Sequence, residues 1–194
     1  MKKIIWMLRA IFLSFFVGKF GFFSYIGKPL YLSGLKGFYF GRKVRIYPNA
    51  RIEVYHSGDF IIEDDVSIGQ NLHAICADEV RICTNTTISA NVYIADVDHT
   101  FDDMAVHVMQ QPLKISKTYI GHNSFIGYGA VILPGTKLGN FCIVGANSVV
   151  KGTIDDYCML AGSPAVIIKR YDMNDKCWKR TDSSGEFLAN LAKS

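Results

Sequence analysis

The sequence predicts an all-β protein built as a prism of stacked coils. The prediction rests on a six-residue repeat, the residue types within it and the one place where it breaks. From residue 120 the chain reads IGHNSF, IGYGAV, ILPGTK, LGNFCI, VGANSV and VKGTID. The first residue of every unit is aliphatic: Ile120, Ile126, Ile132, Leu138, Val144 and Val150. A period of six matches neither a helix nor a simple strand, and it indicates one short strand and one turn, repeated.

The residue types explain how such units can stack. Three units close a triangular coil of about 18 residues, and coils stack at strand spacing, about 4.8 Å. The aliphatic first residue then fills the core, and glycine, frequent at the second position, relieves backbone crowding. The fifth position suits a tight corner because it is small in most units: Ser124, Ala130, Thr136, Cys142 and Ser148.

Upstream, the same frame is present in a looser form. It is marked by Ile62, Val66, Ile68, Leu72, Ile82, Thr86, Ile88, Val92 and Ile94. The two blocks are out of step by two residues near 77–79, which predicts a small bulge at a corner. An earlier, ragged coil is indicated by Ile46, Ala50 and Ile52.

The repeat is interrupted once. After Ile94 the next inward position falls at residue 100, but the pattern resumes only at Ile120. We therefore expect residues 97–118 to be looped out of the prism over its surface, where long insertions commonly carry function. His99 lies at the start of this loop.

These units resemble the repeats of the hexapeptide-repeat acyltransferases. The six consecutive units carry the resemblance, and Ala161-Gly162-Ser163-Pro164-Ala165 is similar to the element that ends the prism in that family. The resemblance implies a left-handed parallel β-helix. Pro164 cannot donate to a strand ladder, so we expect the stack to close there.

The break also resembles a known active-site element. Asp98-His99-Thr100-Phe101 is similar to the Asp-His element of O-acetyltransferases that act on O-antigen, capsule and small sugars. The resemblance implies that His99 is the general base, which takes the proton of a sugar hydroxyl as its oxygen attacks the thioester of acetyl-CoA. A neutral imidazole suits this role because its pKa lies near ambient pH. The expected function is acetyl transfer to a bacterial surface polysaccharide or its precursor.

Further positions carry over from the same resemblance. It places a main-chain contact to the pantetheine arm at Ala146 and an aromatic residue beside the acyl group at Phe125. It adds a cofactor-lining residue at Tyr128 and cations near the coenzyme phosphates: Lys151 and Lys169. Val166 departs from the pattern, because the family often has a second cation there. The family's site lies between neighbouring subunits, which implies a homotrimer.

Three polar residues near the break are candidates for acceptor binding. Asn71 and His73 precede His99 by about a coil and a half, and Asp98 adjoins it. Each has a plainer interpretation, as a solvated side chain for Asn71 and His73 and as a loop cap for Asp98. Asp96 is interpreted in the same way as Asp98, as a residue that caps the loop or sets its charge.

The chain divides into three expected parts. Residues 1–40 form an apolar N-terminal segment, 41–169 the β-helix, and 170–194 a polar tail with a short helix near 186–192. The N-terminal helical pattern comprises Ile4, Leu8, Ile11, Phe12, Phe15 and Phe16. It fits a helix packed on the prism, an amphipathic helix in the membrane interface through residues 1–20, or a cleaved signal peptide. Its uncharged run is too short to span a bilayer.

Composition narrows the partners. A net charge of +4 is too small to argue for nucleic acid. Five cysteines without a Cys-x-x-Cys pair favour a reducing compartment, so the expected location is the cytoplasm, at or near the inner face of the membrane. A lipid-linked glycan would then be a suitable acceptor.

Two other classes use similar prisms. A β-helical zinc carbonic anhydrase needs three ligands and an open position, and it would show a His-x-x-x-x-His pair that this sequence lacks. We therefore expect no metal. A non-enzymatic scaffold would need no interruption of its coils.

Overall fold

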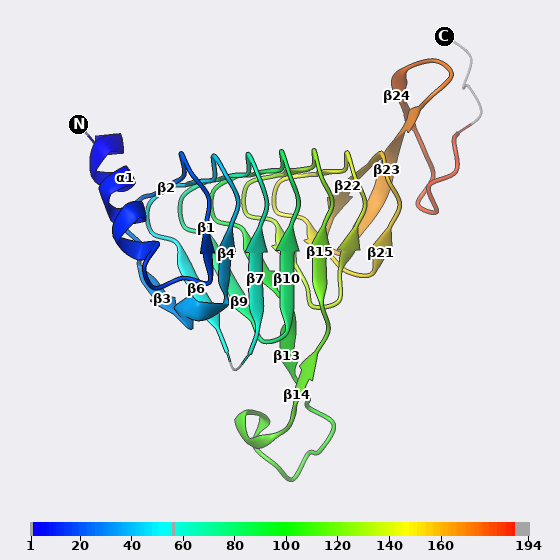
Figure 1. The fold of residues 1–194 in the computed structure, drawn as a ribbon. Helices are drawn as coiled ribbons and strands as arrows, with labels where there is room; N and C mark the ends of the chain where they lie inside the picture. The colour runs from blue at the N-terminus through cyan, green and yellow to red at the C-terminus, as the bar shows by residue number, and fades with distance from the viewer. Residues whose placement is uncertain (1, 56, 189–194) are drawn as a thin grey trace.

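The computed structural model describes residues 2–55 and 57–188 and shows a parallel β-helix of about seven turns, which confirms the predicted fold class (Figure 1). Three sheets form the sides of the prism. The first sheet contains β1 (Lys19–Phe20), β4 (Phe38–Phe40), β7 (Asp59–Ile62), β10 (Glu79–Ile82), β15 (Thr118–Ile120), β18 (Lys137–Leu138) and β21 (Thr153–Ile154). The second sheet contains β2 (Tyr25–Ile26), β5 (Arg45–Ile46), β8 (Ser67–Ile68), β11 (Thr87–Ile88), β16 (Phe125–Ile126), β19 (Ile143–Val144) and β22 (Cys158–Gly162). The third sheet contains β3 (Tyr31–Ser33), β6 (Arg51–Val54), β9 (His73–Cys76), β12 (Tyr93–Ala95), β17 (Val131–Ile132) and β20 (Val149–Val150).

The aliphatic repeat fills the core as predicted. Ile62, Ile94 and Ile120 are essentially inaccessible to solvent, and so are the first residues of the later units. Glycine at the second position is required by a close approach: a Cβ on Gly121 would lie 2.4 Å from the carbonyl oxygen of Gly139 in the next coil. The left-handed backbone of the corners falls instead at the fourth position, for example at Asn123 (φ 55°), because asparagine tolerates positive φ.

Coil length changes along the prism. From Tyr119, which pairs with Lys137, coils are in register at a separation of 18 residues, which falls to 16 in the last coil, where Lys137 pairs with Thr153. Earlier coils are longer, because the corner between the third and first sheets takes more residues there. It holds the 3₁₀ turn η1 (Leu35–Gly37) in the first coil and residues 96–117 in the fourth. The looped-out segment is therefore an enlarged version of a corner that is already variable.

The first coil starts at Lys19, well before residue 41, where the repeat pattern placed the boundary. β1, β2 and β3 pair in parallel with β4, β5 and β6. The discrepancy has a physical cause: the first sheet uses aromatic core residues in the first three coils, with Phe20 packed edge to face on Phe40 and Phe38 on Phe60, where the later coils use aliphatic residues. A search for aliphatic periodicity passes over such a coil.

The N-terminal segment is a helix, α1 (Lys2–Leu13), which lies across the end of the prism (Figure 1). It packs through Trp6, whose ring lies 5.7 Å from those of Tyr25 and Tyr47, and through the fully buried Ala10. The apolar stripe identified in the sequence is the opposite, exposed side of this helix: Ile4, Leu8, Ile11 and Phe12 are each more than half exposed. Among the described residues, no helix is both long and apolar enough to cross a membrane.

The C-terminal part differs from the expected polar tail. The chain reverses after Gly162, at Ser163-Pro164, so the parallel stack ends where Pro164 predicted. It continues as two antiparallel strands that extend the second sheet, β23 (Ala165–Asp172) and β24 (Cys177–Arg180). Phe187 forms a bridge with Thr181 rather than a helical turn, and the rest of the expected helix, 189–192, lies outside the described residues.

Candidate active site

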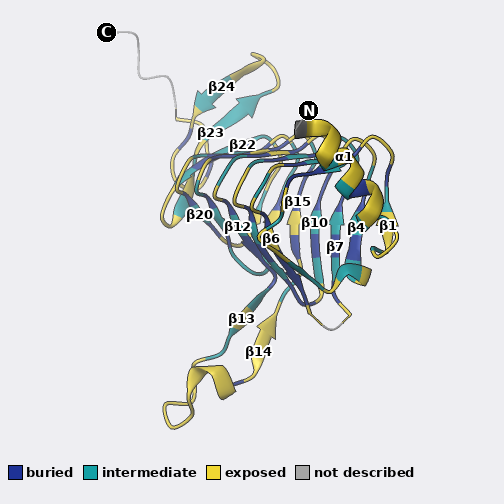
Figure 2. Cartoon of the chain, turned by 90° about the vertical axis from the view of Figure 1, so that its left-hand side faces the viewer, coloured by how far each residue is buried: buried dark blue, intermediate teal, exposed yellow. Residues whose placement is uncertain are grey.

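The insertion forms an arm that projects from the prism at the corner between the third and first sheets (Figure 2). Its base is a two-stranded antiparallel ribbon, β13 (Val97–His99) and β14 (Leu113–Ile115), in which His99 is paired with Leu113. The outer part contains the short 3₁₀ turn η2 (Val108–Gln110) and is exposed throughout 101–110. A ribbon is an economical support for a catalytic residue because its ladder bonds fix the backbone while both faces stay accessible.

The root of the arm is held by the buried carboxylate of Asp96. Its oxygens accept hydrogen bonds from the backbone N–H groups of Ala77 at 2.7 Å and Asp78 at 2.8 Å, which belong to the preceding coil. The Asp96 carbonyl accepts a bond from the Ser116 N–H at 2.7 Å, so the same residue joins both strands of the arm to the prism. The expectation that Asp96 caps the loop agrees with this geometry. A charge without solvent requires such partners, which makes the arm's position well determined.

His99 lies at the end of the ribbon's supported part. Its side chain is half-buried, and Nδ1 is buried without a hydrogen-bond partner among the described residues. The ring faces a cavity of about 250 Å³ whose other lining residues are mostly apolar or aromatic: Tyr55, Ile75, Tyr93, Val97, Asp98 and Leu113. Nδ1 is itself shielded from a ligand, so Nε2, the other nitrogen of a ring that lines the cavity, is the one placed to take a proton.

His73 stands next to this cavity. Its ring meets that of Tyr93 edge to face at 5.3 Å, and its Nε2 is likewise buried without a hydrogen bond. Burial lowers the pKa of His73, and the nearby Arg51 charge lowers it further. The imidazole is therefore neutral at pH 7 and keeps an acceptor nitrogen beside the Tyr93 wall.

A buried carboxylate lies behind His73. Glu53 accepts bonds from Arg51 Nε at 2.6 Å and from the Tyr55 hydroxyl at 2.7 Å. These two donors hold the pKa of Glu53 below its usual value, so the group is ionised at neutral pH. The Tyr55 ring is thereby fixed in place as a wall of the His99 cavity.

A second, smaller cavity of about 80 Å³ lies on the other side of the ribbon. It is lined by Asp98, Lys114, Ser116, Leu133, Pro134 and Lys151. The carboxylate of Asp98 therefore separates two concave surfaces, one with His99 and one with two lysines. Lysine ammonium groups at such a surface suit an anionic group such as phosphate.

Comparison with known proteins places the chain in a family. A family model described as bacterial transferase hexapeptide (six repeats) matches residues 117–152, and a hexapeptide repeat of succinyl-transferase matches residues 60–95. An Escherichia coli (strain K12) protein named as a lipopolysaccharide biosynthesis O-acetyl transferase, WbbJ, is 31% identical over 159 residues, which cover 78% of this chain and 81% of that protein. The chain belongs to the hexapeptide-repeat acyltransferases.

Other relatives of this acyltransferase agree. A Mycobacterium tuberculosis protein named as an acetyltransferase is 30% identical over 153 residues, covering 78% of this chain and 50% of that protein. The fold matches the Bacillus cereus N-acyltransferase AntD, solved with dTDP and 3-hydroxybutyryl-CoA, with a TM-score of 0.74 and 18% identity, covering 86% of this chain and 90% of that one.

The residues expected to bind the acyltransferase's cofactor lie on different sides of the prism within one chain. Tyr128 and Ala146 occupy the same corner in successive coils, between the second and third sheets, and both are exposed. Phe125 lies on the second sheet at 44% exposure, and Lys169 lies on β23 beyond the edge of that sheet. Of the expected cofactor residues, Lys151 alone shares a cavity with a neighbour of His99.

Asn71 is placed away from the His99 cavity. It adopts φ 60° at the corner between the second and third sheets, and its Nδ2 donates to Asn91 Oδ1 at 2.7 Å. Asn91 in turn donates to the Tyr128 hydroxyl. The three side chains form a ladder along one edge of the prism, so the structure joins Asn71 to Tyr128 rather than to His99.

Sequence reasoning missed Tyr55, Tyr93 and Glu53 as neighbours of the site. The usable signal is coil spacing: β6, β9 and β12 are consecutive strands of the third sheet, so residues one and two coils before the break must lie beside it. The part of the chain that the structure describes holds no group of three or more His, Cys, Asp or Glu side chains arranged to bind a metal.

Proposed function

We propose that this acyltransferase moves the acetyl group of acetyl-CoA to a sugar hydroxyl in a bacterial surface polysaccharide or its precursor, with His99 as general base. The observation that carries the proposal is the His99 imidazole, which lines its cavity and whose nitrogens make no hydrogen bond among the described residues. Support also comes from WbbJ, which is named for lipopolysaccharide biosynthesis.

The residues support each part of the reaction. Tyr55 and Tyr93 offer aromatic faces against which a sugar ring packs, and the apolar walls exclude water from the thioester. The acceptor oxygen attacks the thioester carbonyl carbon while His99 takes the hydroxyl proton. The tetrahedral intermediate then expels the coenzyme thiolate, which receives that proton from the imidazolium. Asp98 and His73 supply polar contacts for the acceptor.

We infer that the cofactor part of the site is completed by a second subunit. Phe125, Tyr128 and Ala146 lie on other sides of the prism from the arm, so one chain does not gather them around His99. A closed threefold ring brings the second-sheet side of one prism against the arm side of the next and joins the two half-sites. Light scattering should give three times the mass of one chain, and a stable, active monomer would contradict the ring.

The acceptor fits a peripheral membrane location. A glycan linked to a lipid at the inner leaflet would be within reach of a protein that touches the membrane through residues 1–20. Such a protein works on the cytoplasmic side, where acetyl-CoA is supplied.

The proposal is tested by turnover. Release of free thiol from acetyl-CoA should be stimulated by sugar acceptors that carry a free hydroxyl, and mass spectrometry should find the acceptor heavier by one acetyl group. The matched control is the same sugar with that hydroxyl blocked, which should be inert. A protein that neither turns over acetyl-CoA nor is stabilised thermally by coenzyme A would be a scaffold, and the proposal would fail.

A further inference from the structure

We infer that the N-terminal end of the prism docks on a bilayer containing anionic lipid, with the prism standing upright on the surface. The docking surface, here called the end face, is formed by the outer side of α1, the turn that follows it and the first two corners of the first coil. Its apolar members are Ile4, Ile5, Leu8, Ile11, Phe12, Phe15, Phe22, Phe23 and Leu30, each more than half exposed. This inference rests on the proposed function and adds to it the surface that contacts the membrane and the orientation of the prism on that membrane.

The end face is not needed to hold the helix in place. α1 is anchored on its inner side by Trp6 and Ala10, and Arg9 Nη1 donates to the Ile26 carbonyl at 3.2 Å. Among the described residues the outer side makes no comparable contact with the prism, yet it carries isoleucine, leucine and phenylalanine. A contiguous apolar surface of this kind marks a site of association, and an apolar helix side with flanking cations suits the headgroup boundary of a bilayer.

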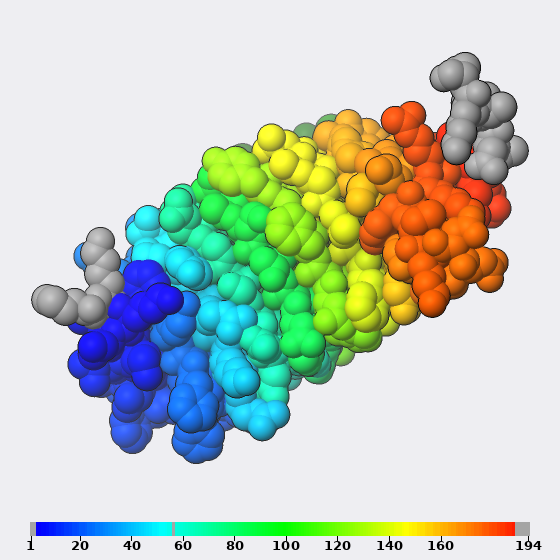
Figure 3. All heavy atoms as spheres, turned by 90° about the horizontal axis from the view of Figure 1, so that it is seen from above, coloured from blue at the N-terminus to red at the C-terminus, as the bar shows by residue number. Residues whose placement is uncertain are grey.

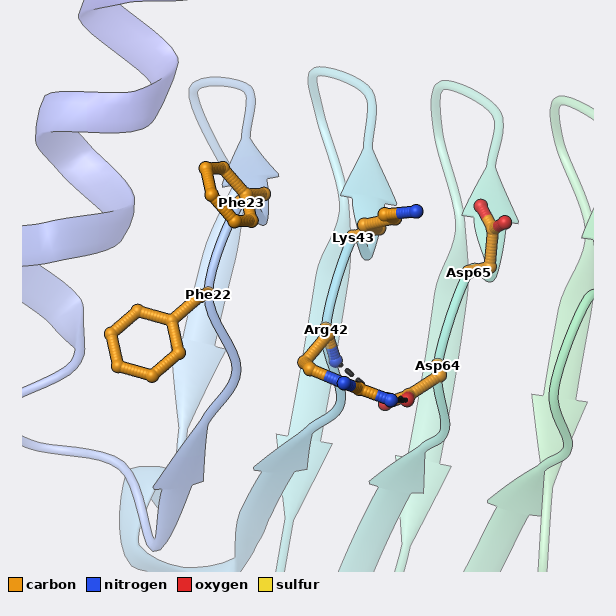
Figure 4. Close-up of a pocket in the computed structure, with 6 residues that line it drawn as sticks. All are labelled: Phe22, Phe23, Arg42, Lys43, Asp64 and Asp65. Carbon is orange, nitrogen blue, oxygen red and sulfur yellow. Dashed lines mark hydrogen bonds and ion pairs between the residues drawn. The ribbon is translucent and has the colours of Figure 1, made fainter.

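The first corner provides a second, independent indication. Phe23 adopts φ 61°, a left-handed conformation that phenylalanine tolerates poorly, and its ring is 79% exposed. The equivalent corner positions of the next four coils hold Lys43, Asp65, Asn85 and Asn123, and the aromatic residues at this corner in the last two coils, Phe141 and Tyr157, stack on each other at 5.1 Å. Figure 4 shows the Phe22 ring turned toward α1, away from the ion pair between Arg42 and Asp64. Neither ring is placed here by core packing.

Charge identifies the partner. Residues 1–52 contain ten of the chain's 21 lysines and arginines and none of its 17 acidic residues, so the mild net charge conceals a strong division along the chain. The exposed cations of α1 and the first two coils include Lys3, Lys19, Lys28, Lys36 and Lys43. Each cation near an anionic bilayer surface adds to the attraction. A second copy of the same end would instead meet like charge.

The orientation of the prism on the bilayer determines how far the active site lies above the lipid surface. α1 and the C-terminal strands lie at opposite ends of an elongated molecule (Figure 3), and α1 runs across the N-terminal end (Figure 1). A helix that lies in the bilayer interface therefore directs the prism away from it. β12, which leads into the arm, is three strand spacings from β3, or roughly 15 Å. His99 thus faces a hydroxyl carried well above the lipid, on the outer part of a lipid-linked glycan.

Vesicle sedimentation of the full chain tests the inference. We expect binding to vesicles of phosphatidylcholine with phosphatidylglycerol, weaker binding to pure phosphatidylcholine, and loss of the difference at high salt. The variant Leu8→Ser/Phe12→Ser/Phe23→Asn should bind the anionic vesicles at least about tenfold less tightly. Phe23→Asn should not destabilise the fold, since asparagine is favoured at this φ. The matched control, Leu188→Ser, removes an exposed apolar side chain elsewhere and should bind as wild type does.

Three outcomes would overturn the inference: no binding of the wild type to anionic vesicles, equal binding of the triple variant, or self-association through the end face that the triple variant abolishes. The two proposals fail separately, because acetyl transfer to a soluble sugar is measured without membranes. If the wild type binds vesicles but acetylates no sugar, the docking surface stands and the proposed activity is wrong.

Discussion

Replacing His99 by alanine is expected to lower kcat for acetyl transfer to a soluble sugar by about 10²–10⁴-fold, the usual contribution of a general base. The imidazole lines the cavity, and its nitrogens make no hydrogen bond among the described residues that would compete with an acceptor hydroxyl. Thiol release at saturating acetyl-CoA measures the effect. Stabilisation by coenzyme A should be unchanged, because the ring acts on the acceptor rather than on the coenzyme.

His107 supplies the matched control. It lies on the same arm, exposed, with Nδ1 accepting a bond from the Met109 N–H at 3.2 Å. His107→Ala should therefore keep the wild-type kcat, and a reduction equal to that of His99→Ala would indicate damage to the arm rather than loss of a base. Full activity of His99→Ala would exclude the mechanism.

Replacing Asp96 by alanine is expected to lower the free energy of unfolding by about 3 kcal/mol or more. The change removes two hydrogen bonds accepted by the carboxylate and leaves the N–H groups of Ala77 and Asp78 unpaired at a site without solvent. Urea denaturation measures the loss. Asp96→Asn should fall between alanine and wild type, because one amide oxygen can replace only one of the two carboxylate acceptors.

Asp102 is the control for this effect. It is exposed on the outer part of the arm, so Asp102→Ala should change the free energy of unfolding by no more than about 0.5 kcal/mol. An Asp96→Ala variant with the wild-type denaturation midpoint would show that the arm does not depend on this carboxylate. If the carboxylate does hold the arm, the arm of Asp96→Ala should be less firmly fixed to the prism, and kcat should fall together with the free energy of unfolding.

The fold was predicted correctly where a residue type always has the same structural role, as the aliphatic residue at the first position of each repeat does. Each aliphatic residue of the later units enters the core within its own coil, so Ile120, Ile126 and Ile132 can be assigned without knowing what surrounds them. The first coil escaped prediction because its core residue in the first sheet, Phe20, is aromatic and packs edge to face on Phe40. The C-terminal strands β23 and β24 escaped it because their antiparallel pairing has no six-residue period.

Some residues of the candidate site could be predicted from the sequence and others could not. His99 was located because the six-residue repeat stops there, and the arm confirms that the chain leaves the prism at this point. Tyr55, Tyr93 and Glu53 carry no such mark. They are ordinary residues of earlier coils, and they become neighbours of His99 only because β6, β9 and β12 stack in one sheet.

The linear order of residues was sufficient for the β-helix, its register from Ile120 onward and the position of the break, since period and side-chain size act within a single coil. The depth of Asp96, the walls around His99, the separation of the expected cofactor residues and the exposure of the outer side of α1 required the folded chain. These properties depend on which coils are adjacent and on which side of the prism each strand lies. A sequence read residue by residue does not contain that information, because stacking brings together positions 16 or more residues apart.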